Sequence, residues 1–325
     1  MTHTTFYHAF EAAFRGSREE ILGRLEGYRA FVGPLSQSVI PKSALDLGCG
    51  RGEWLETLKT FGFNPSGVDL DEGMLADCIA ANLSVERGEA LEALAATADE
   101  SLGLLSAFHL IEHLSFDAVR TIVMEGLRVL APGGMLILET PNPENIEVGT
   151  VTFHNDSTHV APIPPNVLKF LAEHAGYAKI KLLRLNSSPL QDPKKVGLND
   201  VLFKASPDYA LVAQKAGSST VMAATEAAFA AATGPSTRDL AEAYDKSLDE
   251  LRREIALLKK TKKTRLYYRS KKIQTLNKQI KRWFESRRER RRVKAAEARR
   301  AVSHNVPQID RGQPWTPVAL PNLVR

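Results

Sequence analysis

The sequence predicts an α/β fold with a doubly wound, mainly parallel sheet, followed by a long basic helix or coiled coil. Between residues 44 and 215, short apolar runs alternate with stretches of helical periodicity, which is typical of such a sheet. Residues 237–301 contain no proline or glycine and carry a large excess of lysine and arginine. The two cysteines, Cys49 and Cys78, are too few for a disulfide framework, and no apolar run of about 18 residues occurs. We therefore expect a cytoplasmic protein without a secretion signal or a membrane-spanning segment.

Seven apolar runs are expected to form strands. In chain order they cover residues 44–47, 66–69, 84–87, 104–108, 135–139, 179–185 and 209–214. Helices fit between them, and the clearest one begins with Ser115 as its N-cap and ends before Pro132-Gly133-Gly134. Ahead of the first strand, residues 6–31 predict a helical segment that is interrupted near Gly16.

Composition divides the chain into five segments. We expect a helical N-terminal lid (1–43), the α/β domain (44–216), a linker rich in small residues (217–236), a basic helix or coiled coil (237–301) and a disordered tail (302–325). Heptad spacing in the fourth segment runs through Leu248, Leu251, Ile255 and Leu258, and it resumes at Leu266, Ile273, Leu276, Ile280 and Trp283. The step of eleven residues from Ile255 to Leu266 predicts a four-residue stutter between two short coiled-coil stretches.

Charge is distributed unevenly along the chain. Residues 259–300 hold 19 lysines and arginines against three glutamates, a net charge of +16, so the remainder of a chain with net charge +5 carries −11. A segment of this charge needs solvent or an anionic partner. It is predicted to be a solvated coiled coil that sets the oligomeric state, a helix lying on anionic lipid, or an arm that binds nucleic acid.

A glycine-rich turn follows the first strand. The run Ala44-Leu-Asp-Leu-Gly-Cys-Gly-Arg-Gly52 places Gly48, Gly50 and Gly52 between the strand and a helical pattern, where a ligand can approach the backbone and the helix N-terminus. Asp69 follows the second strand, and a carboxylate there can accept hydrogen bonds from ribose hydroxyls. A dinucleotide oxidoreductase would use similar positions, but its fingerprint requires glycine where this chain has Glu53.

These residues resemble the class I S-adenosylmethionine-dependent methyltransferases, which use D-x-G-x-G-x-G, an acidic residue after the second strand and a P-G-G turn before the fifth. The resemblance covers about residues 45–214 and implies S-adenosylmethionine as the cofactor. It implies that Asp46 and the three glycines border the methionine part, that Asp69 holds the ribose and that Leu70 packs on adenine. Glu89 and Ala90 would lie near the adenine amino group, although the family more often has aspartate at the position of Glu89. His109, after the fourth strand, is a further predicted cofactor contact.

Acceptor chemistry is expected after the fourth and fifth strands. The residues His109, Glu112 and His113 also match the H-x-x-E-H pattern of some zinc peptidases, but the pattern begins at a strand end and no second ligand helix is visible. The chain better resembles methyltransferases that act on hydroxyl groups, in which an E-H pair and a later histidine hold a divalent cation or deprotonate the acceptor. Glu112, His113 and His159 are therefore the predicted catalytic residues and the candidate metal ligands; His154 and Asp156 are weaker candidates.

A narrower resemblance is to the methyltransferase domain of bacterial O-antigen chain-terminating enzymes. The segments that carry it are Phe6-Tyr7, Phe14-Arg-Gly-Ser-Arg18, Phe108-His-Leu-Ile-Glu-His-Leu114, Glu139-Thr-Pro-Asn-Pro-Glu-Asn145 and Thr158-His-Val-Ala-Pro-Ile-Pro-Pro165. The resemblance implies a glycan or lipid-linked glycan acceptor, a lid containing Tyr7, Arg15 and Arg18, a glycosyltransferase partner and a place at the inner face of the plasma membrane. No kinase motifs follow Lys215, so a sugar hydroxyl is expected rather than phosphate. The alternatives are an RNA-directed methyltransferase that uses the basic segment, or a non-catalytic scaffold.

Overall fold

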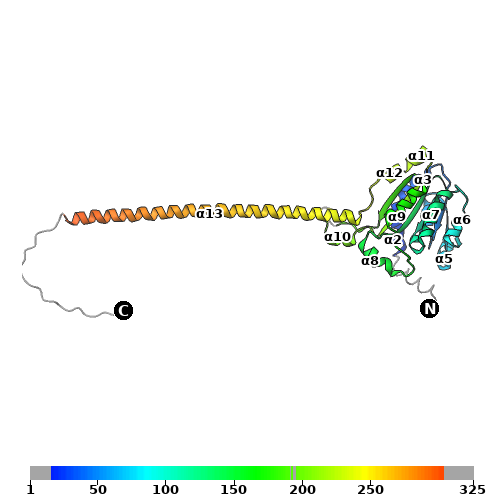
Figure 1. Ribbon diagram of the computed structural model, residues 1–325, viewed down its shortest axis with the longest axis horizontal. Coiled ribbons are helices and arrows are strands. Elements are labelled where there is room, and N and C mark those ends of the chain that lie inside the picture. Colours follow the sequence, from blue (N-terminus) through cyan, green and yellow to red (C-terminus); the bar gives the residue numbers. More distant parts are fainter. Residues whose placement is uncertain (1–15, 191, 193–194, 304–325) are drawn as a thin grey trace, which may run out of the picture. The chain divides into compact units, whose positions relative to one another are not determined.

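The computed structural model describes residues 16–190, 192 and 195–303, and these contain a seven-stranded sheet with helices on both faces (Figure 1). The strands are β1 (Ser43–Leu47), β2 (Asn64–Asp69), β3 (Ser84–Arg87), β4 (Leu102–Phe108), β5 (Leu130–Pro141), β6 (Lys179–Leu185) and β7 (Asp208–Gln214). All seven predicted strands are present. The largest difference is in β5, which begins at Leu130 because that residue already pairs with Leu102 across a register shift.

The strand order is β3-β2-β1-β4-β5-β7-β6. Strands β1 to β5 are parallel to their neighbours, whereas β7 runs antiparallel to both β5 and β6. The chain moves outward from β1 to β3, returns to β4 beside β1 and then moves outward on the other side. The order therefore reverses between β1 and β4, where ligands bind at the carboxyl ends of strands in open sheets of this kind.

Alternate side chains of the central strands enter two hydrophobic cores, one on each face of the sheet. Leu104, Met135 and Ile137 belong to one core, while Leu105 and Leu136 belong to the other. The helices of the first unit are α2 (Arg18–Leu25), η1 (Glu26–Tyr28), α3 (Arg29–Gln37), α4 (Glu53–Thr60), α5 (Glu72–Ala80), α6 (Ala90–Ala96), η2 (Ile111–His113), α7 (Phe116–Val129), α8 (Ile146–Thr150), η3 (Thr152–Asn155), α9 (Pro165–Ala175), α10 (Leu198–Phe203), α11 (Ser219–Ala224) and α12 (Glu226–Ala230). Burial of both faces explains why β4, β5 and β7 are mostly apolar, whereas the edge strands β3 and β6 contain charged residues.

The segment before β1 packs into the core. Ser17 caps α2 in a capping box with Glu20, which accounts for the expected interruption near Gly16. Tyr28, Phe31 and Leu35 are then buried against the face of the sheet that also contains Trp54. Residues 16–43, expected to belong to a lid, thus form part of the core because their aromatic and aliphatic side chains lie on one side. Residues 1–15 of that expected lid lie outside the described residues.

Residues 217–236, expected to be a linker, contain the short helices α11 and α12. Val221 and Ala228 are buried, and the Phe229 ring meets the Phe31 ring edge-on at 5.3 Å. The ammonium group of Lys181 donates to the Phe229 carbonyl at 2.7 Å. The small residues of this segment allow the backbone to approach the sheet closely: a Cβ on Gly217 would lie 2.6 Å from the Gly133 nitrogen.

The last element, α13 (Thr237–Ser303), is one continuous helix, as predicted. Its first turns belong to the α/β unit, where Leu240 packs with Val196, Val201 and Ala205. A second unit begins at Leu251, and every residue from 251 to 297 is exposed. Coiled-coil pairing of this helix stays a prediction, and the predicted tail beyond Ser303 lies outside the described residues. None of the helices in the described part of the chain is sufficiently long and apolar to cross a membrane.

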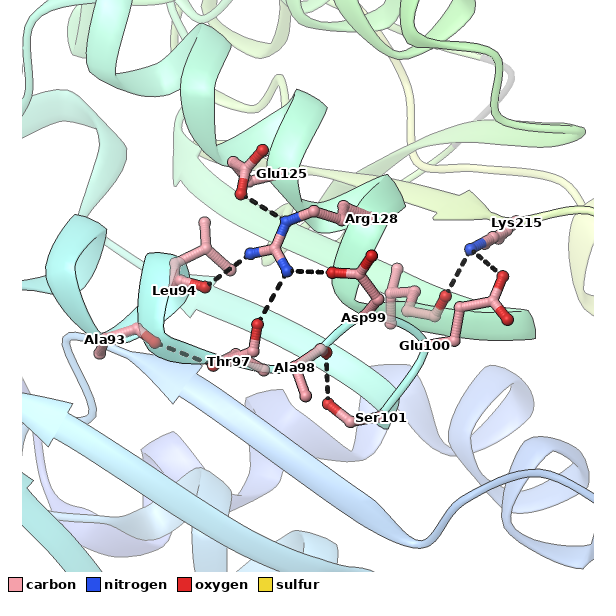
Figure 2. Close-up of polar contacts among 11 residues, drawn as sticks. Ala93, Leu94, Thr97, Ala98, Asp99, Glu100, Ser101, Glu125, Arg128 and Lys215 are labelled. Carbon is pink, nitrogen blue, oxygen red and sulfur yellow. Dashed lines mark hydrogen bonds and ion pairs between the residues drawn. The ribbon is translucent and has the colours of Figure 1, made fainter.

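A polar network holds the amino-terminal edge of the sheet, away from the carboxyl ends of β1 and β4. Figure 2 shows the Arg128 guanidinium donating to the carbonyls of Leu94 and Thr97, at 3.1 and 2.8 Å, and to the carboxylates of Asp99 and Glu125. The two carbonyls belong to the last turn and C-cap of α6, where an arginine satisfies acceptors that the helix leaves free. Arg128 therefore joins α6, the loop before β4, and α7.

Arg128→Ala should lower the thermal midpoint of the protein by about 3 °C or more, because it removes several hydrogen bonds to one guanidinium at once. Arg120, also on α7, forms an exposed pair with Asp117 at 3.2 Å and provides the matched control. Arg120→Ala should change the midpoint by less than about 1 °C, since exposed pairs contribute little. Calorimetric scans of both variants test this, and equal midpoints would contradict the role assigned to Arg128.

Candidate functional site

The turn between β1 and α4 depends on glycine. Gly48, Gly50 and Gly52 have φ angles of 69°, 51° and 82°, in the left-handed region that other residues rarely adopt. A Cβ on Gly52 would lie 2.4 Å from Leu83, so this glycine also allows α4 to pack closely. A Cβ on Gly50 would meet no atom within 4 Å, so its backbone faces open space. The turn can therefore accept a ligand directly against Gly50.

Asp69 lies beside this turn at the end of β2. Its Oδ2 accepts a hydrogen bond from the Gly50 N–H and its Oδ1 accepts one from the Asp71 N–H, both at 2.9 Å. These bonds fix the carboxylate, which retains lone pairs for hydroxyl donors. Leu70 next to it is 56% exposed and available to pack on a flat ring. After β3, Glu89 is exposed and Ala90 is buried at the start of α6, at the same edge of the sheet.

Asp46 is a buried carboxylate at the centre of this region. It is 2% exposed, and its Oδ1 accepts a hydrogen bond of 2.6 Å from the Ser106 hydroxyl, which itself accepts one from the Trp54 indole. Burial is the main cause that raises the pKa of Asp46 to about 7; the Ser106 hydrogen bond acts against this rise, and the charge of Asp69 contributes to it. No ion pair with Asp46 is found among the described residues.

These features fit S-adenosylmethionine, the predicted cofactor. A buried carboxylate whose pKa is raised by desolvation is stabilised when a cationic ligand binds beside it, and S-adenosylmethionine carries both an ammonium and a sulfonium group. Asp69 offers acceptors for ribose hydroxyls, and Gly50 offers an open approach to the backbone.

The predicted acceptor residues come together at the carboxyl ends of β4 and β5. One ligand atom from each of Glu112, His113 and His159 lies within 4.8 Å of the others. The rings of His113 and His159 meet edge-on with centroids 4.7 Å apart. Glu112 is 1% exposed, and its carbonyl accepts from the Val160 N–H at 2.8 Å, which joins the η2 turn to the segment that carries His159.

Hydrogen bonds define which nitrogen of each imidazole is free. The Thr158 hydroxyl donates its proton to Asp156 at 2.6 Å. Nδ1 of His113 lies 2.9 Å from the same hydroxyl oxygen, so this nitrogen must carry a proton and donate it. His159 Nδ1 lies 2.6 Å from the Phe153 carbonyl and must likewise donate. In the neutral form of each ring, Nε2 therefore carries the lone pair that can accept a proton or bind a cation; Nε2 of His159 lies 4.0 Å from Oδ2 of Asp156. Burial, opposed by the charge of Glu112, lowers the pKa of His113 and favours this neutral form.

His109 bridges two glutamates in a manner that the sequence did not predict. It follows β4 with a φ of 50°, and its Nδ1 and Nε2 lie 3.2 and 3.3 Å from carboxylate oxygens of Glu112 and Glu139. Desolvation opposes protonation of the ring, but the two carboxylates outweigh it and raise the pKa of His109 well above its ordinary value. Both ring nitrogens of His109, predicted as a cofactor contact, are thus engaged with these carboxylates.

Other members of this network come from distant parts of the chain. The buried Tyr28 hydroxyl donates to Glu139, and the Thr140 hydroxyl donates to Glu112 at 2.9 Å. Burial and the charge of Glu139 raise the pKa of Tyr28. Glu139 lay within a motif used for the sequence resemblance, whereas Tyr28, 111 residues away, had no local signal that linked it to the site.

The remaining predicted residues are less central. His154 packs its ring against Phe153, and Asp156 orients Thr158. Arg18 forms ion pairs with Glu53 and Glu56, while Tyr7 and Arg15 lie outside the described residues. The zinc-peptidase pattern is not realised, because His109 bonds to two glutamates and His113 pairs with His159 instead.

Comparison with known proteins agrees with this geometry. Residues 21–182 match a family model described as a methyltransferase domain. A probable S-adenosylmethionine-dependent methyltransferase of Mycolicibacterium smegmatis is 30% identical over 136 residues, which make up 42% of this chain and 52% of that protein. A ubiquinone biosynthesis O-methyltransferase of Psychrobacter cryohalolentis is 32% identical over 111 residues, or 31% of this chain and 41% of that protein. The chain spans about half the length of the curated relatives that it matches.

A solved structure is similar over the whole of its own length. The crystal structure of a SAM-dependent methyltransferase from Archaeoglobus fulgidus has a TM-score of 0.57 and 28% sequence identity, and the similarity covers 65% of this chain and 100% of that one.

The affinity for S-adenosylmethionine should increase with pH. At a pKa of about 7 the free Asp46 carboxyl is largely protonated at pH 6, and it must lose its proton when the cation binds. The dissociation constant should therefore fall about tenfold between pH 6 and 7.5. Titration calorimetry measures this, and Asp46→Asn should bind weakly without that pH dependence.

The same variant, free of cofactor, should be more heat-resistant than the wild type at pH 8, because the folded carboxyl with its raised pKa destabilises the protein as pH rises through 7.

Asp69→Ala should weaken the binding of S-adenosylmethionine by about 1.5–3 kcal/mol, the contribution of a hydrogen bond to a charged group. Asp77, a carboxylate on the neighbouring helix α5 that is 60% exposed, supplies the control, and Asp77→Ala should leave affinity unchanged. Equal affinities of the two variants, or tighter binding of NAD than of S-adenosylmethionine, would refute the assignment of Asp69.

Proposed function

Residues 21–182 form an S-adenosylmethionine-dependent methyltransferase domain, and from this premise we propose that the chain is an O-methyltransferase acting on a hydroxyl group. The observation that carries the proposal is the cluster of Glu112, His113 and His159 beside the predicted cofactor site. A hydroxyl is a poor nucleophile at neutral pH and needs a base or a cation, whereas a phosphate or carboxylate acceptor is already anionic.

When bound, S-adenosylmethionine would supply an electrophilic methyl group. A hydroxyl acceptor would have to give up its proton to a residue of this chain as it accepts that methyl group. The free Nε2 of His113 or His159 can take that proton, since Thr158 and Phe153 hold the Nδ1–H of each ring away from the acceptor. His109, between Glu112 and Glu139, holds the Glu112 carboxylate in place beside these two rings.

The same three residues also form a candidate set of metal ligands. Two imidazole nitrogens and one carboxylate with open positions suit a transition-metal ion better than Mg²⁺, which prefers oxygen ligands. Glu112 accepts from Thr140 and His109 and retains lone pairs for a cation. Binding of a divalent ion would require the histidines to stay neutral, which the lowered pKa of His113 favours.

We further propose a sugar hydroxyl of a cell-surface polysaccharide or its precursor as the acceptor. The support is the sequence resemblance to O-antigen chain-terminating enzymes together with the cluster of Glu112, His113 and His159, which a hydroxyl acceptor needs and an anionic phosphate does not. Methyl transfer to a panel of oligosaccharides, with phosphorylated sugars and RNA as competing acceptors, tests the substrate class. Preferred methylation of a phosphate or of RNA would overturn the proposal.

His159→Ala should lower turnover on the acceptor about 100-fold or more, with the affinity for S-adenosylmethionine nearly unchanged. His174, an exposed histidine of α9, provides the control, and His174→Ala should retain full turnover. If His159→Ala and His113→Ala both keep full turnover, acceptor activation by this cluster is excluded.

Chelation separates the two roles of the cluster. A metal role predicts that a chelator inactivates the enzyme and that an added divalent ion restores it, Mn²⁺ or Zn²⁺ more readily than Mg²⁺. A base role predicts no effect of the chelator and a rate that rises with pH as the imidazole becomes neutral.

A further inference from the structure

Part of α13 is basic without any acidic residue. From residue 255 to residue 284 the sequence contains eleven lysines and arginines and no aspartate or glutamate. Isolated helices are usually supported by pairs of opposite charge three or four residues apart, and this stretch has none within it. All of its side chains are exposed. Its charge must therefore be balanced from outside the helix.

The same stretch carries an apolar stripe, which we define as Leu266, Ile273, Leu276, Ile280 and Phe284. Steps of three, four and seven residues place these side chains on one face of an α-helix. They are between 46% and 61% exposed. Aromatic pairs lie at both ends of the stripe: Tyr267 with Tyr268, and Trp283 with Phe284. A partner must accordingly accept an apolar face as well as positive charge.

A second copy of this helix could accept the apolar face but could not balance the positive charge. Pairing along the seam would bring two stretches of net charge +11 together and would place Lys262 and Arg269 at seam positions. The eleven-residue step from Ile255 to Leu266 further disturbs the regular packing of a coiled coil. Nucleic acid would neutralise the charge but would leave the apolar stripe in water.

We propose that residues 266–284 of α13 bind the surface of an anionic lipid membrane. In such a surface the apolar stripe enters the boundary between headgroups and acyl chains, while lysine and arginine side chains extend to the phosphates. Tryptophan and tyrosine favour this boundary. A fluid lipid layer, unlike a partner helix, accepts a stripe that is interrupted by Arg269 and preceded by the eleven-residue step from Ile255 to Leu266. This inference does not depend on the identity of the methyl acceptor.

The test uses the full chain with phosphatidylcholine vesicles that contain about 30% phosphatidylglycerol. We expect it to sediment with these vesicles and not with pure phosphatidylcholine, and to dissociate as salt is raised. Trp283 should show a blue-shifted emission on binding. The shift should persist in Trp315→Phe and disappear in Trp283→Phe, because Trp54 is buried in the sheet unit.

Two double variants separate the apolar stripe from general hydrophobicity. Ile273→Gln/Ile280→Gln interrupts the stripe, whereas Leu257→Gln/Val293→Gln makes the same kind of change on other faces of the helix. The first should weaken vesicle binding about tenfold or more, and the second less than about twofold. Replacing Lys271, Lys278 and Lys281 with glutamine should weaken it on the order of 100-fold. Circular dichroism and S-adenosylmethionine binding confirm that each variant is folded.

Three outcomes would overturn the inference. Equal vesicle binding by both apolar variants would exclude the stripe as the contact. A lipid-independent oligomer that only the stripe variant dissociates would assign the face to a second copy. Binding to RNA that all apolar variants retain, without vesicle binding, would identify the segment as a nucleic-acid arm.

Discussion

The organisation of the site follows from the burial of carboxylates at the carboxyl edge of the sheet. Asp46, Glu112 and Glu139 are each less than 10% exposed, and removing a charge from water costs several kcal/mol unless other groups compensate for it. Glu112 and Glu139 share the His109 imidazolium and accept further bonds from Thr140 and Tyr28. Among the described residues, the Ser106 hydroxyl is the only group that donates a hydrogen bond to the Asp46 side chain, and burial raises the pKa of Asp46 to about 7. The protein thus provides the His109 cation for Glu112 and Glu139, and it leaves Asp46 to a cationic ligand.

This arrangement also explains why the N-terminal segment packs where it does. Tyr28 donates to Glu139, and its ring lies edge-on to Trp54 and Phe108, with centroids 5.6 and 5.4 Å away. The side chains that bury the hydroxyl therefore belong to the helix after the glycine turn and to β4. Structural and site functions are separated along the strands: carboxylates and histidines gather at the carboxyl ends, whereas Arg128 and Lys215 tie helices and loops at the opposite edge.

The two units of the chain differ in their physical basis. The α/β unit buries continuous apolar strands between two layers of helices, so its stability comes from its own core. From residue 251 to residue 297 the helix is exposed and has no core, and it carries a basic charge together with an apolar stripe. A surface with both features is unusual for a segment that is merely solvated.

The sequence alone determined the local features of this protein. Alternating apolar runs predicted all seven strands, and the absence of proline and glycine predicted α13. Because parallel strands end at one edge of the sheet, the positions after strands predicted that Asp69 lies beside Gly50. The same argument predicted that Glu112 and His113 lie near His159. Periodicity carries no information about which distant side chains meet, so the tertiary structure alone decided that Tyr28 reaches Glu139 and that His109 joins two glutamates. It also decided that residues 217–236 pack against the sheet, since their small residues suit a loose linker and a close contact equally well. Burial in three dimensions sets the pKa of Asp46, and no pattern along the chain records it.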